Sequence, residues 1–382
     1  MQMLIRLVRN GGAVLVGTCV LIVLLEVSLR PAAYFWHGRS EYHLYYGFHS
    51  LVGRVGINPM TTFQGEYYKL PPHYVLRGAA GQASETASTN ALGFRGRDFA
   101  VTKAPGVFRV VCLGESSTFG YRNGDAETYP FYLQKLLEHD NLQAEVINAG
   151  FPYYNTGSIL SLLKNEILSY EPDLITLYAA YNDTSWPTEI GTMGRVALWV
   201  HSHSITYLLA KDSAAGLVGN VEQRVYRRTI PQRLRDEAFM ENDEKVARRY
   251  RMNVEAIIHI ARSRNIPLVV IKQPVTRRRK GYETMSYEQE YQLIKEKFAQ
   301  GSRLTSIETW MLKQHHLMTE LDAIASEAKL PVVDNIRIVD QDRRRLASWV
   351  HLTSEGNQRL AEALKAVIEA YILQKRVSEA TI

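Results

Sequence analysis

The sequence predicts an α/β domain built on a three-layer, doubly wound parallel sheet. Short runs of β-branched and other apolar residues alternate with amphipathic helical segments, which is typical of a parallel sheet covered by helices. The predicted strands span residues 107–113, 144–148, 173–180, 267–271 and 330–333. The predicted helices span residues 129–139, 157–170, 243–264 and a segment that follows Thr353. In such a fold, functional side chains gather at the carboxyl ends of the strands.

The composition is that of a globular protein and excludes several functional classes. Of the 382 residues, 46% are hydrophobic and 22% are charged, which is the balance of a folded chain with a sizeable core. The net charge is +6, but the basic residues are scattered and no nucleic-acid-binding motif accompanies them. Only Cys19 and Cys112 are present, so neither a disulfide framework nor a metal site is predicted.

The first 35 residues differ in kind from the rest and predict a membrane anchor. Arg6 and Arg9 precede an apolar segment at residues 11–29, in which Glu26 is the only charged residue. A helix of this length just spans the hydrocarbon if Glu26 lies at the outer interface. The two arginines place the N-terminus in the cytoplasm. A cleaved signal peptide is the alternative interpretation, but the segment offers no clear small-x-small cleavage site.

The remaining chain divides into two predicted parts. Residues 36–105 are rich in Tyr, Gly and His and predict a linker with a small flanking subdomain. Residues 106–382 form the α/β domain, with insertions near residues 186–240 and 275–304. Insertions of this length are either functional lids over the active face or solvated helical decoration.

A serine follows the first predicted strand at a position suited to a nucleophile. Ser116 lies in the run Gly-Glu-Ser-Ser that begins at Gly114, where the strand should turn into a helix. Backbone N–H groups at a helix N-terminus stabilise an oxyanion beside such a hydroxyl. The alternative interpretation is that Ser116 is an ordinary helix cap.

Three further residues are predicted to reach the same edge of the sheet. Gly150 closes an Asn-Ala-Gly run, Asn182 lies in Tyr-Asn-Asp, and His351 lies in Val-His-Leu-Thr before the last helix. A glycine lets its backbone N–H approach a ligand closely, and an asparagine adds an amide donor. Each also has a structural interpretation, because glycine and asparagine are common in turns.

In this order, the four runs resemble the four sequence blocks of SGNH (GDSL-like) hydrolases, from about residue 108 to residue 373. The stretch Asn-Ala-Leu-Gly-Phe-Arg-Gly at residues 90–96 resembles one that precedes the first block in membrane-anchored bacterial members. The resemblance implies a flavodoxin-like fold and no cofactor. Together with the predicted anchor, it implies a single-pass protein of the bacterial inner membrane whose C-terminal domain lies in the periplasm.

Carried over by position, the resemblance implies a role for each residue. Ser116 matches the nucleophile and His351 the general base, while Gly150, Asn182 and the Ser116 backbone N–H match the oxyanion-hole donors. The chemistry agrees, because a serine hydroxyl needs a base near neutral pH and histidine's pKa suits that task. No metal is required when amide donors hold the developing charge.

Two positions depart from the family pattern. Glu115 stands where an Asp usually precedes the nucleophile, which is a conservative change. Ser348 replaces the Asp expected three residues before the histidine, where a carboxylate normally orients the imidazole and stabilises its charged form. Three ways to orient His351 remain open: Ser348 or a backbone carbonyl, Asp340, or Asp342.

The sequence therefore predicts a serine esterase that acts on a small acyl ester of an acylated small molecule or glycan. O-acetyl groups of an envelope or exported polysaccharide are the expected substrate. One alternative is an O-acyltransferase, because an acyl-serine can pass its acyl group to a sugar hydroxyl. The other is a non-catalytic, membrane-tethered assembly or carbohydrate-binding protein. Tyr153 and Tyr154 either line a sugar site or pack in the core.

Overall fold

The computed structural model of the protein describes residues 14, 16–25, 27–28, 67, 69–70, 72–73, 75–77, 86–185, 232–276, 285–302 and 304–380. The chain divides into two compact units. One comprises residues 1–60 and 190–231, and the other comprises residues 61–189 and 232–382.

In the first unit, the described residues between 14 and 28 are helical. Their side chains are exposed, and the large apolar ones among them include Val16, Ile22 and Leu24. Among the residues that the structure describes, no helix combines the length and the apolar character needed to cross a membrane. The predicted anchor at residues 11–29 lies partly outside the described residues.

The second unit is built on a five-stranded sheet in which every neighbouring pair is parallel. The order across the sheet is β4-β3-β5-β6-β7. The strands are β3 (Phe108–Gly114), β4 (Ala144–Gly150), β5 (Leu174–Tyr178), β6 (Leu268–Lys272) and β7 (Val332–Asp334). The predicted α/β parallel sheet is thereby confirmed. A separate antiparallel pair, β1 (Val75–Arg77) and β2 (Thr86–Ser88), precedes it.

The strand order places a switch point at the centre of the sheet. From β3 the chain first moves outward to β4 and then returns to β5 on the other side. The register aligns Gly114 at the end of β3 with both Gly150 on β4 and Tyr178 on β5. Because the three strands end at one level, the loops that follow them emerge together, and such an edge is where open α/β sheets bind ligands.

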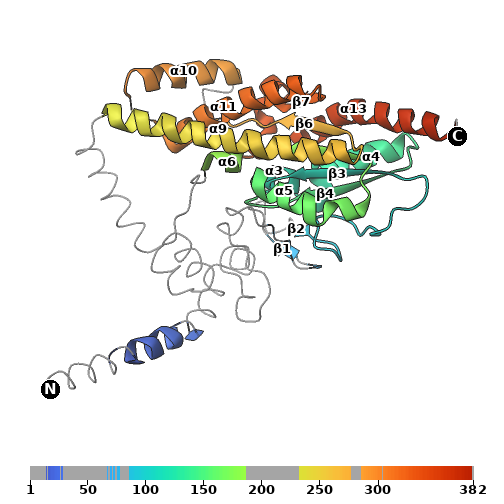
Figure 1. The fold of residues 1–382 in the computed structure, drawn as a ribbon, viewed down its shortest axis with the longest axis horizontal. Helices are drawn as coiled ribbons and strands as arrows, with labels where there is room; N and C mark the ends of the chain where they lie inside the picture. The colour runs from blue at the N-terminus through green and yellow to red at the C-terminus, as the bar shows by residue number, and fades with distance from the viewer. Residues whose placement is uncertain are drawn as a thin grey trace. The chain divides into compact units, whose positions relative to one another are not determined.

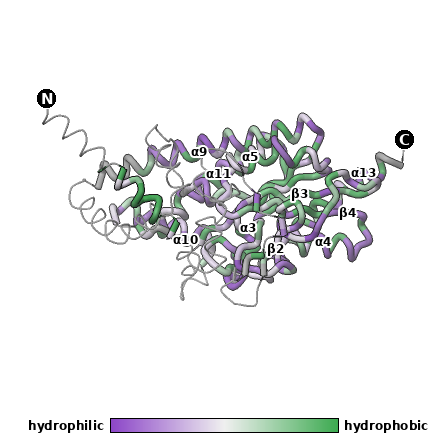
Figure 2. Tube along the Cα trace, turned by 90° about the horizontal axis from the view of Figure 1, so that it is seen from below, coloured by the Kyte–Doolittle hydropathy of each residue, from purple (hydrophilic) through white to green (hydrophobic). Residues whose placement is uncertain are grey.

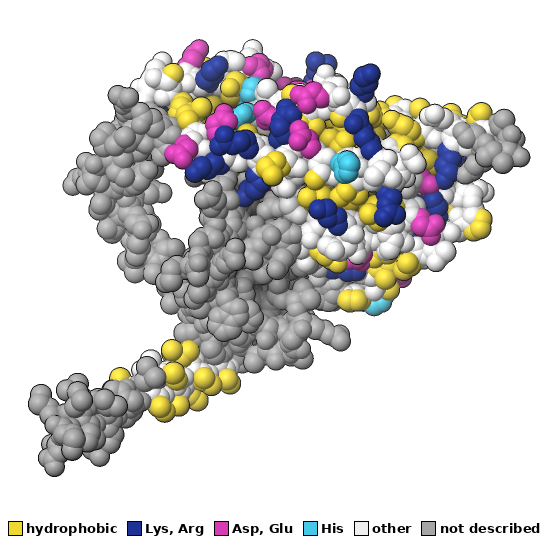
Figure 3. Space-filling model, in the orientation of Figure 1, with side chains coloured by type: hydrophobic (Ala, Val, Ile, Leu, Met, Phe, Trp, Pro, Cys, Tyr) yellow, Lys and Arg dark blue, Asp and Glu magenta, His cyan; other side chains and the backbone are white. Residues whose placement is uncertain are grey.

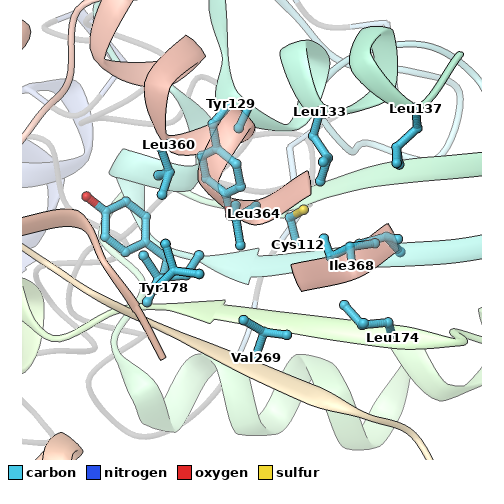
Figure 4. Packing of buried hydrophobic residues seen from close by; sticks show 14 of the residues in the cluster. Cys112, Tyr129, Leu133, Leu137, Leu174, Tyr178, Val269, Leu360, Leu364 and Ile368 are labelled. Carbon is cyan, nitrogen blue, oxygen red and sulfur yellow. The ribbon is translucent and has the colours of Figure 1, made fainter. Parts of the chain in front are cut away.

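One face of the sheet is covered by α4 (Tyr129–His139) and α13 (Ser354–Ala380). Alternate residues of β3, Val110 and Cys112, point into this layer because side chains alternate along a strand. Figure 4 shows Cys112 beside Leu133 of α4 and Ile368 of α13. Because one side of each helix packs against the sheet, apolar residues recur along α4 and α13 at helical spacing, and the sequence predicted both helices from that spacing.

The opposite face is covered by α5 (Thr156–Asn165), α9 (Gln232–Ser263) and α11 (Ser306–Glu327). Figure 2 shows α5 and α9 on one side of the strands and α4 on the other, which gives the three layers. In Figure 1, α9 runs beside α11 and extends beyond the strands.

Several elements differ from the sequence prediction. α9 begins eleven residues before the predicted start at 243, since Gln232 is already helical. The predicted helix at 157–170 is split into α5 and a 3-10 turn (Ile167–Tyr170). The insertion near 275–304 contains the helix α10 (Tyr287–Ala299), which begins with a capping box at Ser286. The other insertion lies mostly outside the described residues, which resume at Gln232.

Charged side chains of both signs are interspersed over the face shown in Figure 3. Arg251 of α9, for example, forms ion pairs with Glu255, Glu320 and Glu327. Mixed charges of this kind favour a solvated surface.

Candidate active site

The turn that carries Ser116 is forced close to the sheet by glycines. β3 ends at Gly114, and α3 (Ser116–Phe119) follows after a single extended residue, Glu115. A Cβ added to Gly150 would lie 2.2 Å from the backbone N of Phe119, so only glycine permits α3 to pack on the end of β4. Ser116 thus begins a helical turn directly above the carboxyl ends of the strands.

The structure brings Ser116 and His351 together, although 235 residues separate them in the chain. The hydroxyl oxygen of Ser116 lies 2.9 Å from Nε2 of His351. His351 is held by a tight turn in which the N–H of Ala347 donates to its carbonyl at 2.8 Å. The Ser117 hydroxyl donates to the Val350 carbonyl at 3.3 Å, which ties this turn to α3. Serine and base are therefore in hydrogen-bond reach without a ligand.

The other nitrogen of the imidazole faces Ser348. The Ser348 Oγ lies 2.8 Å from Nδ1 of His351, and it also accepts the backbone N–H groups of His351 at 3.1 Å and Val350 at 3.3 Å. A hydroxyl has two lone pairs and one hydrogen. The Ser348 hydroxyl can therefore either donate to Nδ1 or accept its proton, according to the tautomer of the ring. Only the tautomer with its proton on Nδ1 leaves Nε2 free to accept the Ser116 proton.

The two aspartates considered for the same role point elsewhere. Asp340 accepts the Tyr287 N–H at 2.9 Å and pairs with Arg343 at 3.1 Å. Asp342 caps the 3-10 turn Arg343–Arg345 and pairs with Arg344 at 2.7 Å. The structure therefore brings Ser348, and neither Asp340 nor Asp342, to the imidazole.

Burial and a nearby cation keep His351 neutral. Desolvation of the imidazole, followed by repulsion from the Arg122 guanidinium, lowers the pKa of His351 to about 3. A neutral imidazole can accept a proton, but the low pKa also means that the imidazolium formed during catalysis is poorly stabilised. A carboxylate in place of Ser348 would reverse this effect.

The two predicted oxyanion donors beyond Ser116, Asn182 and Gly150, have different hydrogen-bond partners. Asn182 lies on the short helix α6 (Tyr181–Ser185), and its Nδ2 donates to the Tyr154 carbonyl at 2.7 Å, which fixes the amide. An amide nitrogen carries two hydrogens, so one remains for an oxyanion. The N–H of Gly150 instead donates to the Asn148 side chain at 3.0 Å. In this structure, Gly150 serves the close approach of α3.

A protein-family model describes the same stretch of chain. The GDSL-like lipase/acylhydrolase family matches residues 112–359, from the middle of β3 to the start of α13. The chain belongs to this family. The match contains Ser116, Asn182 and His351. The predicted SGNH (GDSL-like) resemblance is confirmed.

Solved structures that resemble the chain include three esterases or acylhydrolases. The lipase/acylhydrolase from Enterococcus faecalis is 17% identical, with a TM-score of 0.40 over 69% of this chain and 96% of that one. The aryl esterase of M. smegmatis is 14% identical, with a TM-score of 0.40 over 69% and 99%. The psychrotrophic esterase EstA from Pseudoalteromonas sp. is 10% identical, with a TM-score of 0.40 over 69% and 98%. No curated protein matches the chain.

Glu115, the first departure from the family pattern, is a buried anchor. Its carboxylate accepts the N–H groups of Ala180 at 2.9 Å and Asn182 at 3.2 Å. Burial, with repulsion from Asp183, raises the pKa of Glu115 well above its usual range. Glu115 therefore fixes α6, and with it the Asn182 amide, relative to the nucleophile.

Gln273, at the end of β6, completes this arrangement from inside the protein. It is fully buried, its Oε1 accepts the Tyr181 N–H at 2.8 Å, and its Nε2 lies 3.2 Å from the Ser117 hydroxyl. These contacts brace α3 against α6.

The stretch at residues 90–96 supports the nucleophile of this GDSL-family chain, a role that sequence reasoning missed. Arg95 is buried, and its Nη1 donates to the carbonyls of Phe119 and Gly120 while its Nη2 donates to that of Asn123 at 2.6 Å. Phe119 ends α3, whose last carbonyls lack partners within the helix. The sequence shows Arg95 between Phe94 and Gly96, but no local pattern says what it binds.

Aromatic side chains lie beside the serine–histidine pair. The Tyr121 ring packs 5.1 Å from that of His351. Trp349 donates its Nε1–H to the Tyr181 hydroxyl at 3.0 Å and stacks with Trp310 at 6.0 Å. All four aromatic residues are half-buried. Tyr154, by contrast, is fully buried and stacks on Phe151, so it packs in the core.

Proposed function

We propose that the chain is a serine esterase that removes small acyl groups, above all O-acetyl groups, from an envelope or exported polysaccharide. The observation that carries the proposal is the hydrogen-bonded series from Ser116 Oγ to His351 and on to Ser348, with separations of 2.9 and 2.8 Å. Membership of an acylhydrolase family agrees with it.

The proposed reaction proceeds through an acyl-serine. The Ser116 oxygen attacks the ester carbonyl carbon while its proton passes to Nε2 of His351, which requires the tautomer whose Nε2 is unprotonated. The Ser116 N–H and Asn182 Nδ2 hold the negative oxygen of the tetrahedral intermediate. His351 then gives the proton to the departing sugar oxygen as the C–O bond breaks. Water repeats the sequence and releases the acid.

The glycan part of the proposal rests on the aromatic residues beside His351. Rings such as those of Trp349 and Tyr181 offer an apolar face together with a polar edge. Pyranose rings have matching apolar C–H faces and polar rims. An aromatic wall next to the nucleophile therefore suits a sugar ester.

The test is labelling of the full-length chain in isolated membranes with a fluorophosphonate probe. We expect Ser116 to be modified and Ser116→Ala to be unlabelled, with an unchanged folded circular-dichroism spectrum. Ser117→Ala is the matched control and should still be labelled, although its hydroxyl, which contacts Gln273 and the Val350 carbonyl, helps to hold the histidine turn. A wild-type chain that takes up no label would favour the non-catalytic alternative. Labelling without release of acid, but with transfer to added sugar, would favour the acyltransferase.

The membrane location is a second part of the proposal. Its support is the apolar run at residues 11–29 behind two arginines, and the exposure of its described apolar side chains. A fusion of alkaline phosphatase after residue 105 should be active if the domain is exported. Activity confined to a cytoplasmic reporter at the same position would contradict an exported domain.

A further inference from the structure

An exposed arginine lies beside the catalytic histidine in an unusual backbone conformation. Arg122 has φ of 72°, in the left-handed region, and its Nη1 lies 3.4 Å from the Ala347 carbonyl, one residue before Ser348. A non-glycine residue in this region costs about 1 kcal/mol. Such a conformation persists only where the surrounding structure imposes it.

The neighbours of Arg122 hold it in place on both sides. The Tyr121 N–H donates to the Ser116 carbonyl at 2.9 Å, and the Asn123 side chain donates to the Leu352 carbonyl at 2.9 Å. Arg95 fixes the Asn123 carbonyl from below. The guanidinium of Arg122 is therefore carried by a rigid segment between the nucleophile and the histidine turn.

Arg122 forms no ion pair with the part of the chain that the structure describes. Among the described residues, no carboxylate oxygen lies within 4.0 Å of its guanidinium. Two arginines of the 3-10 turn that precedes His351 are paired by contrast: Arg343 with Glu290, and Arg344 with Asp342. A cation at this place also opposes the imidazolium that His351 must form, and Ser348 supplies no negative charge to offset it. A negative charge brought by the substrate would offset it.

We propose that Arg122 binds a carboxylate of the substrate, so that the site selects acyl esters on acidic sugar residues. The planar guanidinium forms two parallel hydrogen bonds to a carboxylate, which fixes both position and orientation. This inference rests on the proposed esterase function and names its substrate class as an acylated uronic-acid glycan. The bound carboxylate also lowers the cost of charging His351 while Ser116 attacks.

The test compares two substrates that differ in charge. O-acetylated oligogalacturonate carries a carboxylate on each sugar, and O-acetylated xylo-oligosaccharide carries none. For the full-length chain in mild detergent, Arg122→Gln should lower kcat/KM on the acidic substrate about 10- to 100-fold, the range of a hydrogen bond to a charged group. On the neutral substrate kcat/KM should not fall, because the variant removes a cation that opposes the His351 imidazolium. For the wild-type chain, added salt should lower kcat/KM on the acidic substrate more than on the neutral one, because it screens an exposed ion pair.

Arg344→Gln is the matched control, since it removes the same charge from the nearby loop, where Arg344 pairs with Asp342. It should affect neither substrate. An equal loss on both substrates in Arg122→Gln would overturn the proposal, because it would show a role in folding or in the general chemistry. An unchanged kcat/KM on the acidic substrate would overturn it as well.

Binding separates this inference from the esterase proposal. The Ser116→Ala chain should bind non-acetylated oligogalacturonate in a calorimetric titration, and Ser116→Ala with Arg122→Gln should bind it at least tenfold more weakly. If neither binds it while wild-type chain still hydrolyses esters, the carboxylate site is wrong and the esterase stands. If binding depends on Arg122 but no ester is cleaved, the esterase proposal is wrong and the carboxylate site stands.

Discussion

Ser348 Oγ lies 2.8 Å from Nδ1 of His351 and accepts the backbone N–H of the same residue at 3.1 Å. A neutral hydroxyl therefore occupies the place from which a carboxylate would stabilise the imidazolium. We predict that Ser348→Asp raises kcat on a neutral acetyl ester about 10- to 100-fold, because a charged acceptor fixes the proton on Nδ1 and stabilises charge on the ring.

The control for this prediction is Ser348→Asn, which is similar in shape to Asp but carries no charge and should give no such gain. Asp342→Asn should leave kcat unchanged, because Asp342 pairs with Arg344 and not with the imidazole. A fall in kcat for Asp342→Asn, with no gain for Ser348→Asp, would show that the loop rearranges to bring Asp342 to His351.

A second prediction concerns the pH dependence of the wild-type chain. Burial and the Arg122 charge lower the pKa of His351 to about 3. The base acts when neutral, so activity is lost only as pH falls through this low pKa. We expect kcat/KM on a neutral ester to show no acid limb between about pH 5 and 8, whereas an unperturbed histidine would give a midpoint near 6.5.

In Ser348→Asp, the added carboxylate should raise the pKa of His351 and move the acid limb to higher pH. Circular dichroism at each pH separates loss of the base from acid unfolding. A wild-type midpoint of about 6.5 or above would contradict the prediction and indicate a charged partner for the ring.

A third prediction concerns Arg95, which donates to three carbonyls around the end of α3. Burial lowers the pKa of Arg95 to about 10, so it remains charged at neutral pH. Arg95→Met removes these side-chain donors, so that the Gly120 carbonyl keeps only the N–H of Asn123, and should lower the free energy of unfolding by about 2–4 kcal/mol. It should also lower kcat, because α3 carries the nucleophile.

Arg97→Met is the control, because Arg97 forms an exposed ion pair with Glu138 at 2.7 Å. Exposed pairs contribute about 0–1 kcal/mol, so urea denaturation should show little change. Equal stability losses in the two variants would contradict a special role for Arg95.

The fold was predictable because local pattern and burial agree in this chain. Apolar residues at Val110 and Cys112 alternate with Val111 and Leu113 on β3, and all four are fully buried, as expected for a strand covered on both faces. Ser116, Asn182 and His351 were predictable because each follows a strand or precedes a helix at one sheet edge. α10 was missed because its apolar side is narrow; among its residues, Tyr287, Glu290 and Ile294 are buried.

Other parts of the site depend on contacts between distant residues, which no local pattern encodes. The N–H of Gly150 donates to the Asn148 side chain, two residues away, and its lack of a side chain permits the packing of α3, so its role as an oxyanion donor stays a prediction. Whether Ser348, Asp340 or Asp342 contacts His351 depends on the tertiary structure of the segment between residues 340 and 351. Arg122 gave no sequence signal, because its exposure and strain arise from its neighbours.

The last prediction concerns Glu115, which is buried beside the nucleophile with a pKa raised well above its usual range by desolvation and by Asp183. A carboxyl group with a raised pKa holds its proton in the folded state after the unfolded chain has released it. Stability is therefore present below the ordinary value of about 4.5 and is lost as pH rises toward the raised pKa, by up to about 1.4 kcal/mol per pH unit.

Glu115→Gln removes this titration. The amide keeps an oxygen for the N–H groups of Ala180 and Asn182, but it places an NH2 group against Gln273, which adds a cost independent of pH. The variant's stability relative to wild type should therefore rise steadily between pH 5 and 8 in urea denaturation followed by tryptophan fluorescence. Glu138→Gln should show no such rise, because at this surface carboxylate desolvation, which raises the pKa, is outweighed by the combined hydrogen bonds and charges of Lys135 and Arg97, and the pKa is lowered. Parallel stability curves for wild type and Glu115→Gln would mean that Glu115 is ionised in the folded protein throughout this range, held by its backbone donors.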